Sequence, residues 1–345
     1  MGFVMSEVEK FRAISISEFI AKYRHLTGFS NPARAVYQAV RELVENALDA
    51  TEAHGILPNI KIAIQCVDPN QDFYKITVEY NGIGIPPHIV PEAFGRVLFS
   101  SKYVLRQTRG MFGIGVKAAV LYAQDTTGQP VEIITSKPSL KFIYHFKIMI
   151  DVNANEPIIV ERGIVRKNVE WHGTIVSLVI KGDWPRARSR VLEYVKRTAV
   201  VTPYANIVLV TPENEIIVYE RVTEKMPKPP REVKPHPYGV ELILLKNIIA
   251  STKYDNIKDV LIHSFQSIGE VTANELLAKA GIDPSINPKT LSDNELIKLV
   301  ETMRSYERYR PPKPDALSPM GVDIIKSGLT RIFDPEFVEA VTRKP

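Results

Sequence analysis

The sequence has almost no cysteine and no long apolar run. Its one cysteine, Cys66, excludes an internal disulfide framework and a cysteine-based zinc cluster, and its place in the apolar run KIAIQCV predicts a residue that fills the core. No run of eighteen or more uncharged apolar residues occurs, so no membrane span is expected. The first residues, MGFVMSEVEKFRAISISEF, mix acidic and basic side chains, unlike a secretory signal. We therefore expect a cytoplasmic protein.

The chain also lacks internal repeats, low-complexity tracts and a strong excess of one charge. It has 44 Lys and Arg against 39 Asp and Glu, a formal net charge of +5, which permits contact with nucleic acid without requiring it. Hydrophobic residues make up 45% and charged residues 24%, as in ordinary globular proteins, so global disorder is excluded. A chain of 345 residues is long enough for two or three domains.

Proline clusters suggest where the domains end. Five prolines between Pro227 and Pro237 cannot support a helix or a central strand, and a second cluster, RPPKP, follows near residue 310. We predict an α+β domain over residues 1–226, a proline-rich linker over 227–238 and a small helical domain over 239–310. The last segment, 311–345, looks too short to be an independent domain.

Local patterns predict the elements of these domains. A helix is expected from Pro32 to about Thr51, with Asn31 as its cap. In the helical domain, Thr272 with Glu275 and Ser292 with Glu295 predict two capping boxes, and Gly281 a helix stop. Alternating or β-branched sequence predicts eight strands, at 59–67, 74–80, 131–136, 141–150, 157–163, 174–180, 206–210 and 214–220.

The first chemical candidate is the segment RELVENALDA. Glu42, Asn46 and Asp49 lie four and three positions apart and so share one face of the predicted helix, opposite an apolar side. A carboxylate one turn before an amide suits a water-orienting base beside a magnesium ligand, since magnesium prefers oxygen donors. The alternative is an ordinary solvated helix face.

Two further segments could contact a nucleotide. In NGIGIPP, directly after a predicted strand, Gly82 and Gly84 let the backbone approach a flat ligand, or simply mark a turn. In SSKY, Ser100, Ser101 and Lys102 offer hydroxyls and an ammonium to phosphate oxygens, or form an exposed loop.

The segment QTRGMFGIGVKAAVLYAQ is the most specific of these signals. Gly110, Gly113 and Gly115 precede a helical run that begins near Val116, so unpaired N–H groups and the positive end of a helix dipole are available to a triphosphate, and Lys117 adds charge. The spacing is neither that of a Walker P-loop nor that of a Rossmann fingerprint. A different ATP-binding fold is required.

These motifs, in this order, resemble those of the GHKL ATPases, the superfamily of gyrase B, MutL, the ninety-kilodalton heat-shock chaperones and sensor histidine kinases. Within that superfamily the strings RELVENALDATEAHGILPNIKI, PEAFGRVLFSSKY and QTRGMFGIGVKAAVLY are similar to those of topoisomerase VI B subunits. The resemblance covers nearly the whole chain. It implies a GHKL (Bergerat) ATP-binding sandwich over residues 1–226, a helix-two-turn-helix domain over 239–310, and the start of a truncated transducer over 311–345.

The resemblance also implies site residues, with ATP and Mg²⁺ as ligands. It makes Glu42 the catalytic base that orients the attacking water and Asn46 the magnesium ligand. The other ATP-binding positions it implies are Tyr80, Gly82, Gly84, Ser101, Lys102, Gly110, Met111, Phe112, Gly113, Ile114, Gly115, Val116, Lys117 and Thr174.

One position departs from the family pattern. The residue before NGIGI is an aspartate in the family, where it accepts a hydrogen bond from the adenine amino group, and here it is Tyr80. A phenol can still accept a hydrogen bond, but it is bulkier and could occupy the adenine pocket. Loss of a charge-assisted bond costs about 1.5–3 kcal/mol, roughly ten- to hundredfold in affinity. Neighbouring Glu79 should not substitute, because adjacent strand residues face opposite sides.

The function that the resemblance implies is that of an ATPase subunit of a type II DNA topoisomerase. Two copies would dimerise when ATP orders the lid, the segment that holds Ser101, Lys102 and residues 110–117. A topoisomerase VI A subunit would cleave double-stranded DNA, and this chain would contact only the sugar–phosphate backbone of that DNA. Family members continue after RKP into a transducer that supplies a lysine and docks the A subunit. Without it, weak hydrolysis and no usual A-subunit connection are expected.

Two other functions remain open at this point. Tyr80 and the short C-terminal region favour a catalytically weak paralogue that serves as an interaction or regulatory module, whereas Glu42, Asn46 and the complete lid favour the ATPase. A role in mismatch repair or as a kinase fits less well, because the helical domain and the string HGILPNI have no place there.

Overall fold

The computed structural model describes residues 12–110 and 112–342, which form two compact units. The larger, unit 1, comprises residues up to 103, 108–229 and 319 onward. The smaller, unit 2, comprises residues 104–107 and 230–318. The chain therefore passes from one unit to the other within the proline cluster that begins at Pro227.

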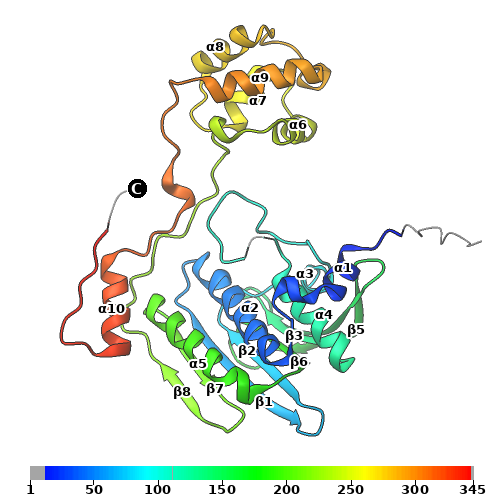
Figure 1. Ribbon diagram of the computed structural model, residues 1–345, viewed down its shortest axis with the longest axis vertical. Coiled ribbons are helices and arrows are strands. Elements are labelled where there is room, and N and C mark those ends of the chain that lie inside the picture. Colours follow the sequence, from blue (N-terminus) through cyan, green and yellow to red (C-terminus); the bar gives the residue numbers. More distant parts are fainter. Residues whose placement is uncertain (1–11, 111, 343–345) are drawn as a thin grey trace, which may run out of the picture. The chain divides into compact units, whose positions relative to one another are not determined.

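Unit 1 is built on one eight-stranded mixed sheet (Figure 1). The strand order is β5-β4-β3-β6-β2-β1-β7-β8, and every neighbouring pair is antiparallel except β1 and β7. All eight predicted strands are confirmed: β1 (Asn59–Asp68), β2 (Phe73–Tyr80), β3 (Val131–Ser136), β4 (Phe142–Asp151), β5 (Glu156–Arg166), β6 (Gly173–Lys181), β7 (Asn206–Val210) and β8 (Ile216–Tyr219).

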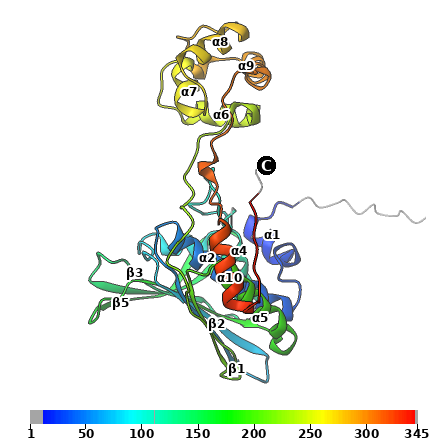
Figure 2. The same cartoon turned by 90° about the vertical axis from the view of Figure 1, so that its left-hand side faces the viewer.

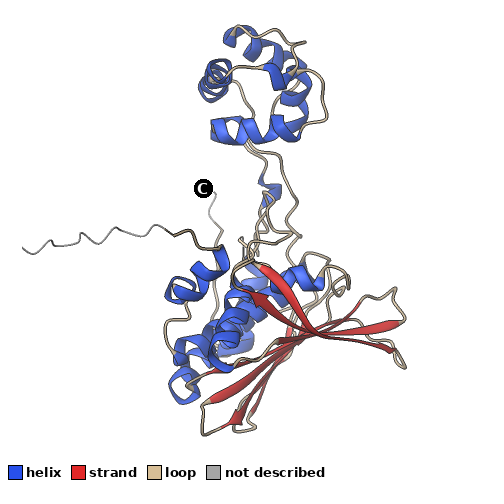
Figure 3. Cartoon of the chain, turned by 90° about the vertical axis from the view of Figure 1, so that its right-hand side faces the viewer, coloured by secondary structure: helices blue, strands red, loops and turns tan. Residues whose placement is uncertain are grey.

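The long helices of unit 1 lie on one face of this sheet (Figure 3). They are α2 (Pro32–Glu52), α4 (Gly115–Thr127) and α5 (Trp184–Val201), joined by the shorter α1 (Ile16–Lys22), α3 (Val90–Gly95) and a 3-10 turn at Arg24–Thr27. The predicted start of α2 is confirmed, because the Asn31 side chain accepts a hydrogen bond from the Arg34 backbone N–H at 2.9 Å and Pro32 is the first helical residue.

Apolar side chains from helices and sheet meet in one core. Ile60, Ile62 and Ile64 of β1 point into it, and α2 contributes Leu43 and Leu48 from the next layer. Each large apolar side chain buried in this way stabilises the fold by about 1.5–3 kcal/mol. Packing therefore fixes the rotation of α2 about its axis, and with it the direction in which its polar stripe faces.

The final helix of unit 1, α10 (Val322–Phe333), lies beside α5 (Figure 2). A side chain at Gly328 would overlap the carbonyl of Val200, so only glycine permits this close approach. Arg331 donates hydrogen bonds to the backbone carbonyls of Ala199 and Glu220. Helix α10 thus packs on α5.

Unit 2 is a small helical bundle with its own core. Its helices are α6 (Leu242–Ser251), α7 (Ile257–Ser264), α8 (Glu270–Ala280) and α9 (Asp293–Ser305), with 3-10 turns at Pro237–Gly239, Pro288–Thr290 and Pro314–Ala316. The predicted capping box of Ser292 with Glu295 is confirmed, as is the left-handed stop at Gly281.

Two sequence expectations are wrong. Thr272 does not cap α8: the helix begins at Glu270 with Gly269 at the cap, so Thr272 and Glu275 both lie inside it, and Glu275 accepts a hydrogen bond from the Tyr306 hydroxyl instead. Cys66 does not fill the core: it is exposed, because it lies near a register shift where the last four residues of β1 are no longer buried. In the described ranges, none of the helices has the length and apolarity to cross a bilayer.

Candidate functional site

The polar stripe of α2 is the centre of the candidate site. Glu42, Asn46 and Asp49 are only partly buried, whereas Leu43 and Ala47 between them are buried in the core. The structure therefore brings the three predicted polar residues to one accessible side of the helix. The core holds that side in place.

The Glu42 carboxylate reaches the first residue of α4. A side chain at Gly115 would overlap Oε2 of Glu42, so glycine is required for this approach. The other oxygen, Oε1, accepts a hydrogen bond from Nε2 of Gln38 at 2.7 Å. Burial, followed by the neighbouring charge of Glu45, raises the pKa of Glu42 above its ordinary value, which makes the carboxylate a stronger base.

Asn46 is bound by a cation from the lid. Nζ of Lys102 lies 3.0 Å from Oδ1 of Asn46 and 2.6 Å from Oδ2 of Asp49. The amide oxygen predicted to bind magnesium thus accepts a hydrogen bond from an ammonium group. Predicted residues from α2 and from the SSKY segment, 56 positions apart, are brought together here.

Tyr80 and Thr174 face each other across neighbouring strands. They are directly opposite in the pairing of β2 with β6, and the Tyr80 side chain is only 7% exposed. Burial raises the pKa of the Tyr80 hydroxyl, and a hydrogen bond with Thr174 offsets part of that rise. Thr174 also shares a hydrogen bond with the hydroxyl of Thr135 at 3.0 Å. The ring lies against the turn at Gly82.

The NGIG turn is fixed by its backbone. Gly84 has φ +71°, and a side chain there would overlap the carbonyl of Ser136, so glycine is needed on both counts. Asn81 accepts a hydrogen bond from the Asn59 N–H at 2.7 Å, and the Ile85 N–H donates to the Thr135 hydroxyl at 2.9 Å. The turn therefore lies between the ends of β1, β2 and β3.

The glycine strip, of which the structure describes residues 110 and 112–115, is the part of the lid that leads into α4. Gly113 lies against Ser100, and the Tyr103 hydroxyl donates to the carbonyls of Leu98 and Phe112. Ile114, the cap residue of α4, has no polar side chain, so the first N–H groups of this 13-residue helix receive no bond from it. Such a helix end suits an anion.

The remaining predicted lid positions vary in burial. Ser101 is exposed, and so is Phe112, at 60%. Val116 and Lys117 are buried within the first turn of α4. Burial and the nearby charge of Lys102 lower the pKa of Lys117 to about 8, and Nζ donates to the Phe99 carbonyl at 2.8 Å. Met111 lies outside the described residues.

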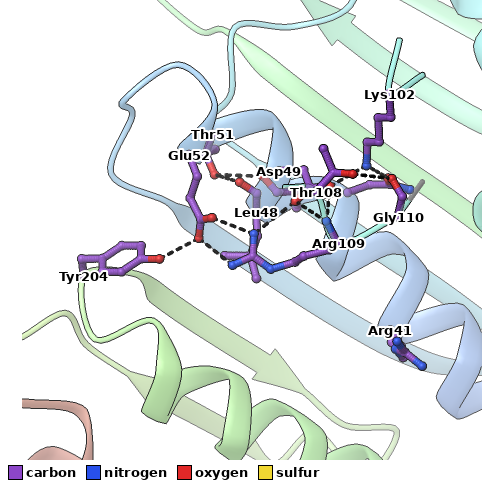
Figure 4. A network of polar contacts seen from close by, with 12 residues as sticks. Arg41, Leu48, Asp49, Thr51, Glu52, Lys102, Thr108, Arg109, Gly110 and Tyr204 are labelled. Carbon is purple, nitrogen blue, oxygen red and sulfur yellow. Dashed lines mark hydrogen bonds and ion pairs between the residues drawn. The ribbon is translucent and has the colours of Figure 1, made fainter. Parts of the chain in front are cut away.

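Sequence reasoning missed four residues around this site. Figure 4 shows three of them, Glu52, Arg109 and Tyr204. Arg109, directly before the glycine strip, is bound to Glu52 and Asp49 of α2, and the Tyr204 hydroxyl donates to Glu52 at 2.8 Å. Gln38, which holds Glu42, is the fourth. Glu52 continues the spacing of the α2 stripe beyond Asp49, so the stripe could have indicated it, but nothing local points to Arg109 or Tyr204.

Known proteins are similar to this chain. Residues 31–150 match the model of the histidine kinase-, DNA gyrase B-, and HSP90-like ATPase family. Three curated proteins, each named as the B subunit of type 2 DNA topoisomerase 6, are similar: 56% identical over 342 residues in Metallosphaera sedula, 55% over 338 in Sulfurisphaera tokodaii and 54% over 342 in Saccharolobus islandicus. The chain is a homologue of these topoisomerase 6 B subunits.

These alignments cover 98–99% of this chain and 64% of each relative, so the chain spans just under two thirds of the length of those topoisomerase 6 B subunits. A solved structure, that of the ATPase and transducer domains of DNA topoisomerase II from Balamuthia mandrillaris, is similar with a TM-score of 0.45 and 18% identity over 62% of each chain. The expected α+β GHKL fold is confirmed by the family match and by the mixed sheet with its helices.

The residues present fit the magnesium and phosphates of a nucleotide better than they fit its adenine ring. Among residues 12–110 and 112–342, no group of three or more His, Cys, Asp and Glu side chains could hold a metal ion. Asn46 offers one amide oxygen, and magnesium bound there would take phosphate oxygens and water as further ligands. The end of α4, Lys102 and Lys117 supply positive charge for phosphates. Where the adenine ring would lie, by contrast, Tyr80 provides no carboxylate for the adenine amino group.

Proposed function

We propose that this chain supplies the ATP-binding and ATP-hydrolysing subunit of a type II DNA topoisomerase of the topoisomerase VI kind, acting in the cytoplasm. The observation that supports this most directly is the convergence of Glu42 and Asn46 on the N-terminal end of α4 and on Lys102. In the whole enzyme, ATP binding would favour a dimer of B subunits, and a partner A subunit would cut duplex DNA held through its backbone.

Glu42 is the base in this mechanism. Gln38 binds one carboxylate oxygen, which leaves the other to orient a water molecule and take its proton. Burial raises the pKa of Glu42, so its carboxylate holds a proton better than an exposed glutamate would.

The negative charge of the phosphates would be neutralised by magnesium on Asn46 and by the ammonium groups of Lys102 and Lys117. Asn46 would hold magnesium, which neutralises charge on the phosphate oxygens when it is bound. Lys102, whose ammonium is held by Asn46 and Asp49 in this structure, would supply positive charge to the phosphates. The N–H groups at the start of α4 receive further phosphate oxygens without needing to reorganise.

The proposal is tested by Glu42→Gln, measured for ATP binding by calorimetry and for hydrolysis with magnesium. We expect ATP affinity close to that of the unchanged chain and a loss of turnover of about a hundred- to ten-thousandfold, because the amide cannot accept the proton. Glu193→Gln, on α5 and paired with Arg197 one turn away, is the matched control and should hydrolyse normally. Equal turnover in all three proteins would contradict the assignment.

A second function is favoured by one observation, the buried Tyr80 ring opposite Thr174. A ring in this place competes with a purine for space, so the chain could act as an interaction module that binds nucleotide weakly. Catalytic residues would then be kept without being used.

Tyr80→Asp separates the two functions. The aspartate restores a charged acceptor for the adenine amino group and should tighten ATP binding by roughly ten- to hundredfold. GTP is the control, since guanine has no amino group at that position, and its affinity should not improve. Saturable ATP binding by the unchanged chain supports the ATPase, and binding only after substitution supports the module.

A further inference from the structure

Arg109 joins the lid to the C-terminal end of α2 through two carboxylates (Figure 4). Its Nη1 and Nη2 lie 2.6 and 2.9 Å from the two oxygens of Glu52, which is a bidentate pair. Nη1 also lies 3.2 Å from Oδ1 of Asp49, and the Arg109 backbone N–H donates to Oδ2 of Asp49 at 3.3 Å. We call Asp49, Glu52, Arg109 and Tyr204 the lid clamp.

The lid clamp differs from an ordinary surface ion pair in its burial. The side chains of Asp49, Glu52 and Arg109 are 11%, 19% and 31% exposed, so water screens their charges less than it screens an open pair. Tyr204 is buried, and its hydroxyl holds Glu52 from the side of the core. Tyr204 therefore holds the Glu52 carboxylate independently of Arg109, and the planar guanidinium binds that carboxylate through two parallel hydrogen bonds.

The clamp lies at the start of the glycine strip. Arg109 directly precedes Gly110, whose carbonyl accepts a hydrogen bond from the Thr108 hydroxyl at 3.0 Å. The other end of the strip, Gly115, lies against Glu42. Glu42 and Glu52 are ten residues apart on α2, about 15 Å along the helix axis. The strip is thus held against α2 at both ends.

We propose that Arg109 is a positioning residue, which through its fork on Glu52 and Asp49 sets the glycine strip along α2 where the phosphates of ATP would bind. This proposal rests on the proposed function for the identity of the ligand. Arg109 itself does not contact the reacting atoms. Its effect on the reaction passes through the placement of the strip's N–H groups.

The test compares Arg109→Gln, which removes the charge, with Arg109→Lys, which keeps the charge and loses the fork. Hydrogen–deuterium exchange of peptides covering residues 98–115 is measured without nucleotide, and KM for ATP and kcat are measured with it. In Arg109→Gln we expect lid exchange about tenfold faster or more, and a KM raised about tenfold with a smaller change in kcat. For Arg109→Lys, lid exchange and KM should fall between the values of the unchanged chain and those of Arg109→Gln.

The matched control is Arg96→Gln, which removes another arginine of unit 1 with two acidic partners, Glu92 at 2.9 Å and Glu156 at 3.4 Å. It should leave lid exchange unchanged. The pair exchange Arg109→Glu with Glu52→Arg should restore part of the protection, which a merely structural loss would not allow.

Three results would overturn the proposal: lid exchange in Arg109→Gln equal to that of the unchanged chain, an equal acceleration in Arg96→Gln, or full protection in Arg109→Lys. The exchange measurement needs no nucleotide. An unchanged chain that fails to bind ATP would therefore overturn the proposed function, while the exchange rates would still decide whether the clamp exists.

Discussion

At the scale of single residues, Lys117 is a buried cation of the candidate site. Its ammonium is buried in the first turn of α4 beside another cation, Lys102, and one carbonyl, that of Phe99, accepts from it. Desolvation without a counter-charge destabilises the folded chain, and a phosphate would supply the missing charge. We therefore expect the buried ammonium to lower the free energy of unfolding of the chain without ligand.

The pH dependence of stability follows from Lys117. Its pKa is about 8 in the folded chain and near 10.5 when unfolded, so between these values the unfolded chain binds more protons and the free energy of unfolding rises with pH. Lys117→Met should raise the free energy of unfolding by up to about 3 kcal/mol below pH 8, with a difference that fades toward pH 10.5. Urea titrations from pH 7 to 10.5 measure this.

Lys61→Met, at an exposed position of β1, is the control for that series and should show no such pH trend. A Lys117→Met chain that is destabilised at every pH would show that the aliphatic stem and its hydrogen bond matter more than the buried charge.

Residues within one element were predictable, and residues that meet across the chain were not. Glu42 and Asn46 share a helix face by their spacing, so the sequence alone places them together. Arg109 lies 57 positions from Glu52, and no periodicity connects them. Tyr80 was recognised as a departure from a motif, but its burial against Thr174 depends on the pairing of two strands and could not be read locally.

At the scale of elements, α2 is the helix on which the site depends. Its start was predictable because an asparagine cap, a proline at the first position and a 3.6-residue apolar period agree. The same reasoning was wrong at Thr272. Thr272 and Glu275 have the spacing of a capping box, but both lie inside α8. A short motif is informative when the flanking periodicity supports it.

The contribution of the α2 cap can be measured with Asn31→Ala. Loss of the hydrogen bond to the Arg34 N–H should lower the free energy of unfolding by about 1 kcal/mol, because one of the first N–H groups of the helix loses its partner. Asn31→Asp keeps an acceptor and should be close to neutral. Chemical denaturation compares the three proteins, and equal loss in both variants would show that the amide matters for another reason.

At the scale of the whole molecule, the residues that the structure describes form two hydrophobic cores, which share no buried residue. One lies between the sheet of unit 1 and its helices, and the other lies inside the helices of unit 2. A core of its own lets a unit unfold cooperatively by itself. Residues of the candidate ATP site belong to unit 1 alone.

We therefore expect two calorimetric transitions, each sensitive to its own core. Leu48→Ala, in α2, should lower the temperature of one transition, and Leu276→Ala, in α8, that of the other. Each substitution should lower the free energy of unfolding of its unit by about 2–5 kcal/mol, because both side chains are buried and would leave a cavity. ATP with magnesium at a hundred times its dissociation constant should raise only the transition lowered by Leu48→Ala, by about 2.7 kcal/mol. If both substitutions shift one common transition, the two cores unfold together and the assignment of separate cooperative units is wrong.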